Sequence, residues 1–107
     1  MLLRGHIHWA LLDKRRPALI VSTNYRNERA SDVIAIPIST TFTPSGYHVP
    51  LQRGEAGLRS RSVALCEQII TIDRERIEPT ALGGPVSRER MREVEAAILR
   101  AIGIAVE

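Results

Sequence analysis

Cysteine, lysine and aromatic residues are scarce in this chain of 107 residues, and each scarcity argues against a class of protein. Cys66 is its only cysteine, so an intrachain disulfide is impossible and a cysteine-rich zinc site is excluded. Only four residues are aromatic, which is few for a protein that binds nucleic acid mainly by base stacking. No apolar run reaches the roughly 20 residues that span a bilayer. Residues 1–6 lack the apolar centre of a signal peptide. We therefore expect a cytoplasmic protein with no membrane segment.

The size and composition fit one globular domain that covers residues 1–107. Hydrophobic residues make up 44% of the chain and charged residues 25%, which is typical of a folded protein. The net charge is +3, and the basic excess lies in residues 1–53. Lys14 is the only lysine, and arginine contacts phosphate through two parallel hydrogen bonds. The arginine content favours a nucleic-acid partner weakly, because arginine-rich codon usage explains it equally well.

Apolar runs separated by turn signals predict several short strands and one terminal helix. Ser87 resembles an N-cap for a helix that reaches about Ile102, and Gly103 marks its end. Pro37 suggests an edge strand or a bulge. The fold class is mainly β (α+β), a small and strongly bent β-barrel with a C-terminal helix. We expect strands over residues 5–12, 18–22, 33–38, 47–51 and 62–72, a surface loop over 23–32, a turn over 42–46 and one helical turn over 73–76.

Two motifs place groups that bind phosphate at the ends of predicted strands. Arg15-Arg16-Pro17 leads into the strand that ends at Ser22, and Ser39-Thr40-Thr41 follows the strand that begins at Val33. If these two strands pair, a guanidinium and a row of hydroxyls would meet at one rim of the barrel. Such a pair of groups can bind a backbone phosphate.

Five segments, in order, resemble the MazF/PemK family of toxin ribonucleases over nearly the whole chain. The segments are Arg4-Gly5-x-Ile7-x-Trp9, Arg16-Pro17-Ala18-Leu19-Ile20-Val21-Ser22, Ile36-Pro37-Ile38-Ser39-Thr40, the stretch from Ser62 to Asp73, and Leu82-Gly83 with the closing helix. The resemblance implies an SH3-like barrel of the CcdB/MazF/Kid type that works as a homodimer. It implies metal-independent cleavage of single-stranded RNA, with no cofactor. It also implies a MazE-like antitoxin whose acidic tail covers the RNA groove.

The resemblance assigns roles to individual residues. Arg16 matches the catalytic arginine of the family, which would stabilise the negative charge that builds on phosphorus. Ser39 stands where the family usually has threonine, and either Ser39 or Thr40 would supply the hydroxyl. Glu67 would orient Arg16 or accept the 2′-hydroxyl proton, because arginine is a poor base. The residues expected to contact RNA are Arg15, Thr40, Thr41 and Gln68.

The chain departs from the family in two places. Leu65 stands where the PemK branch has an arginine implicated in catalysis, so the chain is more similar to the MazF branch. Only Asp13-Lys14-Arg15 separates Leu12 from Arg16, where relatives have a longer loop that folds over RNA. Because this connection is short, the RNA sequence that the protein prefers and the way in which the antitoxin inhibits it stay open.

Other residues that could carry chemistry have simpler explanations. His6, His8 and His48 match no catalytic motif and no metal-ligand spacing. Cys66 resembles a small buried residue more than a nucleophile. Trp9 fits core or dimer packing better than base stacking.

Two other functions remain open at this stage. CcdB-type proteins share the expected fold and poison DNA gyrase without cleaving RNA. They end in a Trp-Gly-Ile-type sequence, whereas this chain ends Ile102-Gly103-Ile104 and lacks the tryptophan. A barrel that binds RNA without cleaving it is the third possibility.

Overall fold

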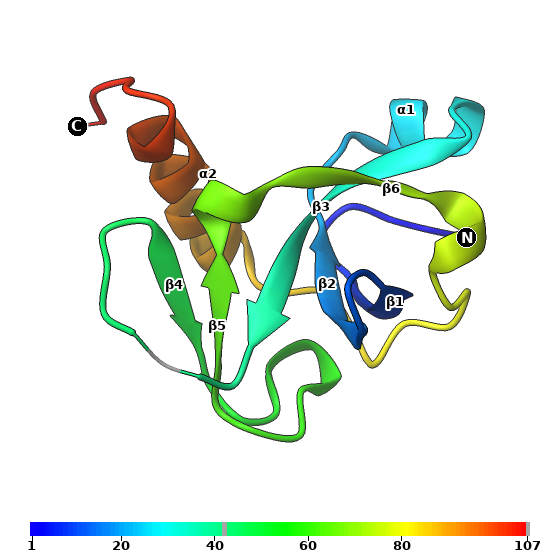
Figure 1. The fold of residues 1–107 in the computed structure, drawn as a ribbon, viewed down its shortest axis with the longest axis horizontal. Helices are drawn as coiled ribbons and strands as arrows, with labels where there is room; N and C mark the ends of the chain where they lie inside the picture. The colour runs from blue at the N-terminus through cyan, green and yellow to red at the C-terminus, as the bar shows by residue number, and fades with distance from the viewer. Residues whose placement is uncertain (42, 107) are drawn as a thin grey trace.

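A computed structural model describes residues 1–41 and 43–106 of the protein (Figure 1). Six strands form one antiparallel sheet in the order β1-β2-β3-β5-β4, and β6 also pairs with β3. The strands are β1 (Ile7–Leu11), β2 (Arg15–Ile20), β3 (Asp32–Ser39), β4 (His48–Leu51), β5 (Ser62–Leu65) and β6 (Ile70–Asp73). The helices are α1 (Asn24–Arg29) and α2 (Arg88–Ala101), with short 3-10 turns η1 (Glu55–Gly57), η2 (Cys66–Gln68) and η3 (Arg74–Arg76). The predicted fold class, mainly β with a C-terminal helix, is confirmed.

β3 lies in the middle of the sheet and changes partner along its length. Its first half pairs with β6, as far as Ala35 opposite Ile70, and its end pairs with β5, from Ile38 opposite Ala64. Pro37 lies between these two pairings. Neither β5 nor β6 therefore needs a hydrogen bond from the backbone N–H that proline lacks. The edge-strand interpretation of Pro37 is therefore wrong. Figure 1 shows β3 running past β6 and then alongside β5 and β2 through the centre of the molecule.

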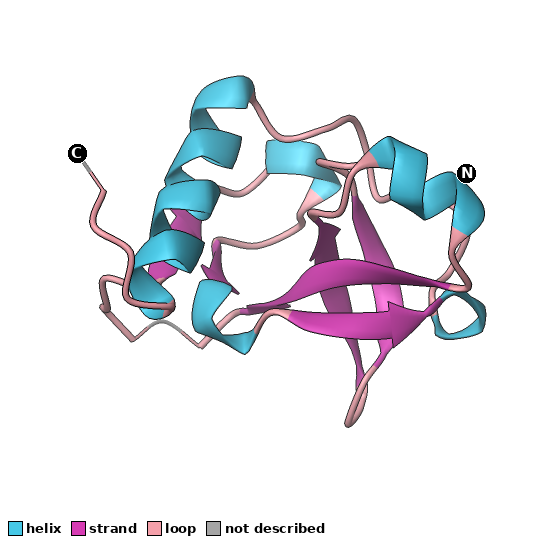
Figure 2. Cartoon of the chain, turned by 90° about the horizontal axis from the view of Figure 1, so that it is seen from above, coloured by secondary structure: helices cyan, strands magenta, loops and turns pink. Residues whose placement is uncertain are grey.

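The core consists of two clusters of buried side chains. The first lies beneath α2 and includes Ile36, Leu51 and Val94, none of which is exposed. The second, around Ile20 and Val33, fills the part of the molecule near β6. Figure 2 shows α2 and α1 at separate ends of the sheet. Among the described residues, no helix is long and apolar enough to cross a bilayer.

Local signals explain α2. The Ser87 side chain accepts a hydrogen bond of 3.1 Å from the backbone amide of Arg90, which confirms the predicted N-cap. Met91, Val94 and Ala97 are its buried residues, as their helical spacing predicts. Gly103 follows with a positive φ of 86°, the left-handed conformation common after a helix. The helix therefore begins and ends close to where the sequence indicated.

The sequence interpretation is wrong in two segments. Residues 23–32 contain the helix α1, not only a loop. Thr23 caps this helix, and its buried Asn27 exchanges hydrogen bonds with Ser22. Residues 62–72 are two strands, because η2 interrupts them at Cys66–Gln68. Ile70, the first residue of β6, is 38% exposed.

Ser22, the last residue of the Arg-Pro motif, has a structural role. Its hydroxyl accepts the backbone amide of Ile34 at 2.9 Å and donates to the side chain of Asn27. Ser22 is 5% exposed, so both contacts are shielded from water. The residue thereby joins the end of β2 to β3 and α1.

The remaining predicted turns are partly described. The helical turn expected over residues 73–76 is η3 (Arg74–Arg76), and Asp73, the last residue of β6, caps it by accepting the amide of Glu75 with its carboxylate. Phe42, the first residue of the predicted turn 42–46, lies outside the described residues, as does Glu107.

Candidate active site

Arg16 is the second residue of β2, beside the short connection from β1. Its guanidinium forms an ion pair of 3.2 Å with Asp13, which lies in that connection. The Arg16 side chain is 21% exposed and that of Asp13 is 72% exposed. Its Nε is buried and has no hydrogen-bond partner within the described part of the chain. Asp13 thus holds the Arg16 guanidinium on one side. The Nε donor of Arg16 has no partner within the described part of the chain, which is typical of an arginine that binds an anion.

Two hollows in the surface meet at Arg16. The carboxylate hollow, about 530 Å³, is lined by Leu12, Asp13, Arg16, Pro37, Glu67, Gln68, Ile69 and Ile70. The hydroxyl hollow, about 360 Å³, is lined by Trp9, Lys14, Arg16, Pro17, Ile38, Ser39, Thr40, Thr41 and Ser62. Among residues 1–41 and 43–106, Arg16 is the one residue that lines both. The guanidinium therefore lies between a wall with carboxylates and a wall with hydroxyls.

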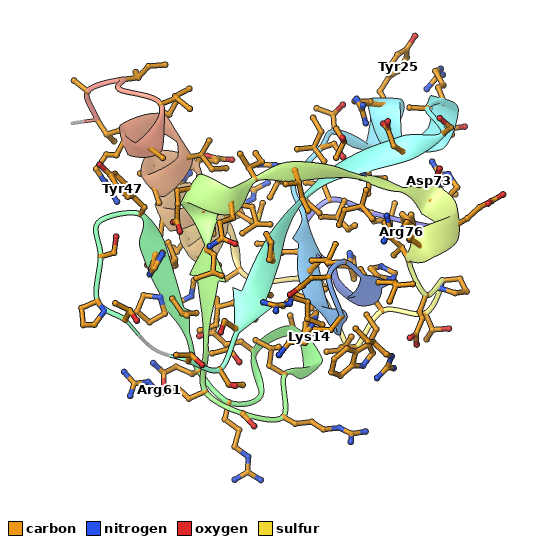
Figure 3. All side chains as sticks on the ribbon, in the orientation of Figure 1. Lys14, Tyr25, Tyr47, Arg61, Asp73 and Arg76 are labelled. Carbon is orange, nitrogen blue, oxygen red and sulfur yellow. The ribbon has the colours of Figure 1, made fainter. Side chains whose placement is uncertain are left out.

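The three predicted hydroxyl residues lie together on the second wall. Ser39 ends β3 and is half-buried, whereas Thr40 and Thr41 are exposed. The Ser39 Oγ accepts the backbone amide of Thr41 at 3.0 Å, which fixes the oxygen and leaves its own proton available to donate. Lys14 lies on the same wall, a contribution that the sequence analysis missed. Figure 3 shows Lys14 beside β2, at the connection between β1 and β2.

Glu67 and Gln68 lie on η2 and not within a strand, which corrects the sequence interpretation. The turn projects both side chains into the carboxylate hollow, where they share a wall with Arg16. The carboxylate that pairs with Arg16 is Asp13, and the partner of Glu67 is His48. The structure thus brings Glu67 to the same hollow as Arg16 without an ion pair between them.

His48 is a second contribution to this site that the sequence did not indicate. Its Nε2 lies 2.9 Å from the Glu67 Oε1, and its side chain is 15% exposed. Burial opposes the charge of both groups. Hydrogen bonds to the Thr43 carbonyl and to Glu67 nevertheless keep the pKa of His48 raised, and the bond from His48 keeps the pKa of Glu67 lowered. The contact joins β4 to η2, so only the folded chain reveals it.

Arg15 has a different environment from Arg16. Its guanidinium lies 4.1 Å from the centroid of the Trp9 ring and forms hydrogen bonds of 2.7 and 3.2 Å with Glu78. Arg15 lines neither the carboxylate hollow nor the hydroxyl hollow. Its contact with RNA remains a prediction, and such a contact would compete with Glu78.

Trp9 connects the hydroxyl hollow to a third one. This Trp hollow, about 540 Å³, is lined by Trp9, Pro17, Thr40, Gly57, Leu58, Arg59, Ser60, Ser62, Glu78, Thr80, Ala81 and Leu82. Trp9, Pro17, Thr40 and Ser62 belong to both hollows, so the two are continuous. Figure 3 shows Arg61 extending outward near the start of β5. A groove with basic and hydroxyl side chains thus runs from η2 past Arg16 to Trp9.

The other candidate groups have structural explanations. His8 is 1% exposed, its Nδ1 lies 2.7 Å from the Glu78 carbonyl, and burial lowers its pKa. Burial raises the pKa of Cys66 to about 12, so its thiol is not a nucleophile near neutral pH. Among residues 1–41 and 43–106, no group of three His, Cys, Asp or Glu side chains is arranged to hold a metal ion.

Comparisons with known proteins identify the family and the fold of the chain. A family profile described as "PemK-like, MazF-like toxin of type II toxin-antitoxin system" matches residues 3–102. No curated protein sequence gives a significant match. The chain is similar to an endoribonuclease solved with its cognate antitoxin from a mycobacterial species, at 26% identity over 100% of both chains and a TM-score of 0.87. It is also similar to the Mycobacterium tuberculosis toxin MazF-mt6, at 28% identity over 94% of this chain and 99% of that one, with a TM-score of 0.85. A MazE-MazF structure from Deinococcus radiodurans matches at 23% identity over 97% of each chain and a TM-score of 0.80, which shows the shared fold.

Proposed function

Since the chain belongs to the PemK-like, MazF-like toxin family of type II toxin–antitoxin systems, we propose that it cleaves single-stranded RNA. The position of Arg16 carries this proposal, because it alone of the residues that the structure describes lines both the carboxylate and the hydroxyl hollow. A phosphate bound there would meet a guanidinium from one side and hydroxyl donors from the other. Two of the similar structures are themselves described as endoribonucleases from mycobacterial species.

The proposed reaction is an internal transesterification. The ribose 2′-oxygen attacks phosphorus, and its proton passes to the Glu67 carboxylate. Arg16 stabilises the charge on the phosphorane, and Ser39 donates a hydrogen bond to a non-bridging oxygen. The bond from phosphorus to the 5′-oxygen then breaks, and that oxygen takes a proton from water. The hydroxide that remains takes the proton from Glu67, which restores the carboxylate. The products are a 2′,3′-cyclic phosphate and a 5′-hydroxyl, with no metal ion or other cofactor in the reaction.

The groove fits an unpaired strand. Its hollows are continuous from η2 to Trp9, and their walls carry Lys14, Arg16 and Arg59 beside the hydroxyls. Basic side chains follow a phosphate backbone, and a tryptophan offers a surface on which a base can stack. Gln68 and Thr41 complete the set of side chains proposed to contact the RNA.

We propose the same partners and location that the family implies. A MazE-like antitoxin with an acidic tail would occupy the groove, since carboxylates and phosphates bind arginine in the same way. A relative is solved with its cognate antitoxin. The protein would act as a homodimer in the cytoplasm. The short connection at Asp13 leaves little chain to fold over the RNA, so the antitoxin tail would contact Arg16 directly.

The test is cleavage of a mixed RNA pool in EDTA, with the ends of the products mapped. We expect cyclic phosphate and 5′-hydroxyl ends, and no cleavage of a strand that is deoxy at the scissile ribose. Arg16→Ala should lower kcat by about 10²-fold or more. Arg29→Ala, on α1 and away from the groove, is the matched loss of an arginine and should cleave normally.

Other outcomes would identify the alternatives. Cleavage by folded Arg16→Ala at the wild-type rate would contradict the proposal. Tight RNA binding without product would favour a non-catalytic barrel, and inhibition of DNA supercoiling would favour a CcdB-like poison.

A further inference from the structure

His48 makes two hydrogen bonds that together require an extra proton. Its Nδ1 lies 2.8 Å from the backbone carbonyl oxygen of Thr43, and its Nε2 lies 2.9 Å from the Glu67 Oε1. A carbonyl oxygen and a carboxylate oxygen are both acceptors. A neutral imidazole carries one N–H, so it can satisfy only one of them. Both contacts can be hydrogen bonds only if His48 and Glu67 together hold one proton more than a neutral imidazole beside a carboxylate does.

That proton resides on the imidazole. The pKa of Glu67 is lowered: burial would raise it, but hydrogen bonds, chiefly from His48, outweigh that effect. The pKa of His48 is raised: burial would lower it, but the Thr43 carbonyl and the Glu67 carboxylate outweigh that effect. His48 is therefore an imidazolium that donates in both directions at pH values below 6.5.

The groups around His48 do not compete with Glu67 for this role. Cys66 lies in the same 3-10 turn as Glu67, and its thiol, with a pKa raised by burial to about 12, stays protonated. Arg100 on α2 donates to the Gly46 carbonyl at 3.1 Å, and arginine keeps its charge in proteins. Tyr47 precedes His48 on the chain and is 45% exposed. Glu67 is thus the acidic side chain paired with His48 in the described part of the chain.

We propose that His48 is a positioning residue, whose protonated ring holds the Glu67 carboxylate in the hollow that Arg16 also lines. The inference deepens the proposed RNA cleavage and rests on it. The ring also holds the Thr43 carbonyl, so it fastens η2 to the segment that follows Thr41. The His48 side chain thereby connects Glu67, on the carboxylate wall of the groove, to Thr43, which follows the residues of the hydroxyl wall in the sequence.

The proton makes this positioning depend on pH. Because the pKa of His48 is raised above 6.5, both hydrogen bonds are present below pH 6.5 and one is lost as the pH rises through the folded-state value. Because the pKa of Glu67 is lowered below 4.5, the carboxylate stays ionised until the pH falls through its own folded-state value. The arrangement in which His48 donates to both Glu67 and Thr43 therefore occupies the window between these two values.

The first test needs no RNA. Nitrogen NMR of the full chain follows the titration of the His48 ring in wild type and in Glu67→Gln. We expect both ring nitrogens to be protonated at pH 6 and the pKa of His48 to fall in Glu67→Gln. An unchanged pKa of His48 in Glu67→Gln would overturn the inference.

The second test measures cleavage of a single-site RNA oligonucleotide between about pH 5 and 9. His48→Gln keeps a donor for Glu67 that does not titrate, and His48→Phe removes it at similar volume. We expect His48→Phe to lower kcat by about 10-fold to 10²-fold at pH 6, as a misplaced group does, with KM little changed. His48→Gln should recover most of that loss, and the ratio of wild-type to His48→Gln kcat should fall as the pH rises through the His48 pKa.

Each result separates the two proposals. Cleavage that depends on Arg16 but is unchanged in His48→Phe would overturn the role of His48 and leave the proposed function intact. A ratio of wild-type to His48→Gln kcat that does not vary with pH would overturn it too. Intact RNA with wild-type protein would contradict the proposed function itself, and the role of His48 with it. His6→Gln removes another histidine and should preserve the wild-type pH profile.

Discussion

Arg16 and Ser39 line the same hollow, although they belong to different strands of the sheet. The pairing of Ala18 with Pro37 brings β2 and β3 together in antiparallel register. Arg16 lies two residues before Ala18, and Ser39 lies two residues after Pro37, so the same register brings Arg16 and Ser39 together. The guanidinium and the hydroxyl are therefore placed by the sheet and not by a loop, which favours a fixed geometry.

The first prediction concerns the shape of the Arg16 side chain. Lysine keeps the charge but loses the planar fork that binds two oxygens at once. We expect Arg16→Lys to lower kcat of RNA cleavage on the order of 10²-fold, with little change in KM. Arg29→Lys on α1 is the matched control. Wild-type kcat in folded Arg16→Lys would mean that charge alone suffices at this position.

The second prediction decides which hydroxyl acts. Ser39 is half-buried and its oxygen is fixed by the amide of Thr41, whereas Thr40 is exposed. We expect Ser39→Ala to lower kcat by about 10-fold to 10²-fold and Thr40→Ala by less than about 3-fold. Ser39→Thr keeps the hydroxyl and should retain activity. A larger loss in Thr40→Ala than in Ser39→Ala would assign the role to Thr40.

The third prediction concerns the ion pair of Asp13 with Arg16. Asp13 neutralises part of the charge that RNA would meet, and exposed pairs of this kind are worth about 0.2–1 kcal/mol. We expect Asp13→Asn to lower KM for RNA by about twofold to fivefold, and the effect to shrink at high salt. Glu28→Gln on α1 removes an equal charge outside the groove. A raised KM in Asp13→Asn would show that the carboxylate mainly orients Arg16.

The fourth prediction tests a close approach of two chain segments. A Cβ at Gly57 would lie 2.2 Å from the carbonyl oxygen of Leu82, and Gly57 has a φ of 85°. Gly54 has a similar φ of 94° and nothing within 4 Å of the added atom. We expect Gly54→Ala to cost about 1–2 kcal/mol of unfolding free energy, the ordinary cost of left-handed backbone. Gly57→Ala should cost clearly more, because the clash is with backbone.

Urea denaturation of the two glycine variants, followed by circular dichroism, measures the difference. Equal losses in Gly57→Ala and Gly54→Ala would mean that Leu82 can move away without cost.

The fifth prediction uses the only cysteine. Cys66 is fully buried and burial raises the pKa of its thiol to about 12, so almost no thiolate exists below pH 9. We expect iodoacetamide to leave the native protein unmodified at pH 8.5 and to label it in denaturant, as mass spectrometry would show. Rapid labelling of the native chain would mean that η2 opens readily, which would also free Glu67.

Residues that act locally were predicted well from the sequence. Ser87 caps α2 because its hydroxyl contacts an amide three residues away, and the strands around Arg16 and Ser39 show apolar runs. The helix α1 was missed because it has six residues and one buried side chain, Asn27. Its stability comes from Thr23, Ser22 and hydrogen bonds from Arg74, which is distant in the sequence.

The carboxylate side of the site shows where prediction from sequence ended. Residues 62–72 have the composition of one buried strand that only Glu67 and Gln68 interrupt, and two polar residues do not distinguish a break at Cys66–Gln68 from a continuous strand. The partner of Glu67 is His48, on β4, and no spacing rule connects them. The role of a histidine such as His48 can be inferred only when the structure shows which acceptor each of its two ring nitrogens contacts.

The change of partners along β3 has a further consequence for how this chain tolerates change. β5 and β6 are each paired to their own half of β3, and η2 with Ile69 separates them. An insertion or deletion in this short bridge would therefore leave the alternation of side chains intact on either side of it. A change in the length of this segment would thus move Glu67 and Gln68 relative to Arg16, while the pairing of β5 and of β6 with β3 keeps its register.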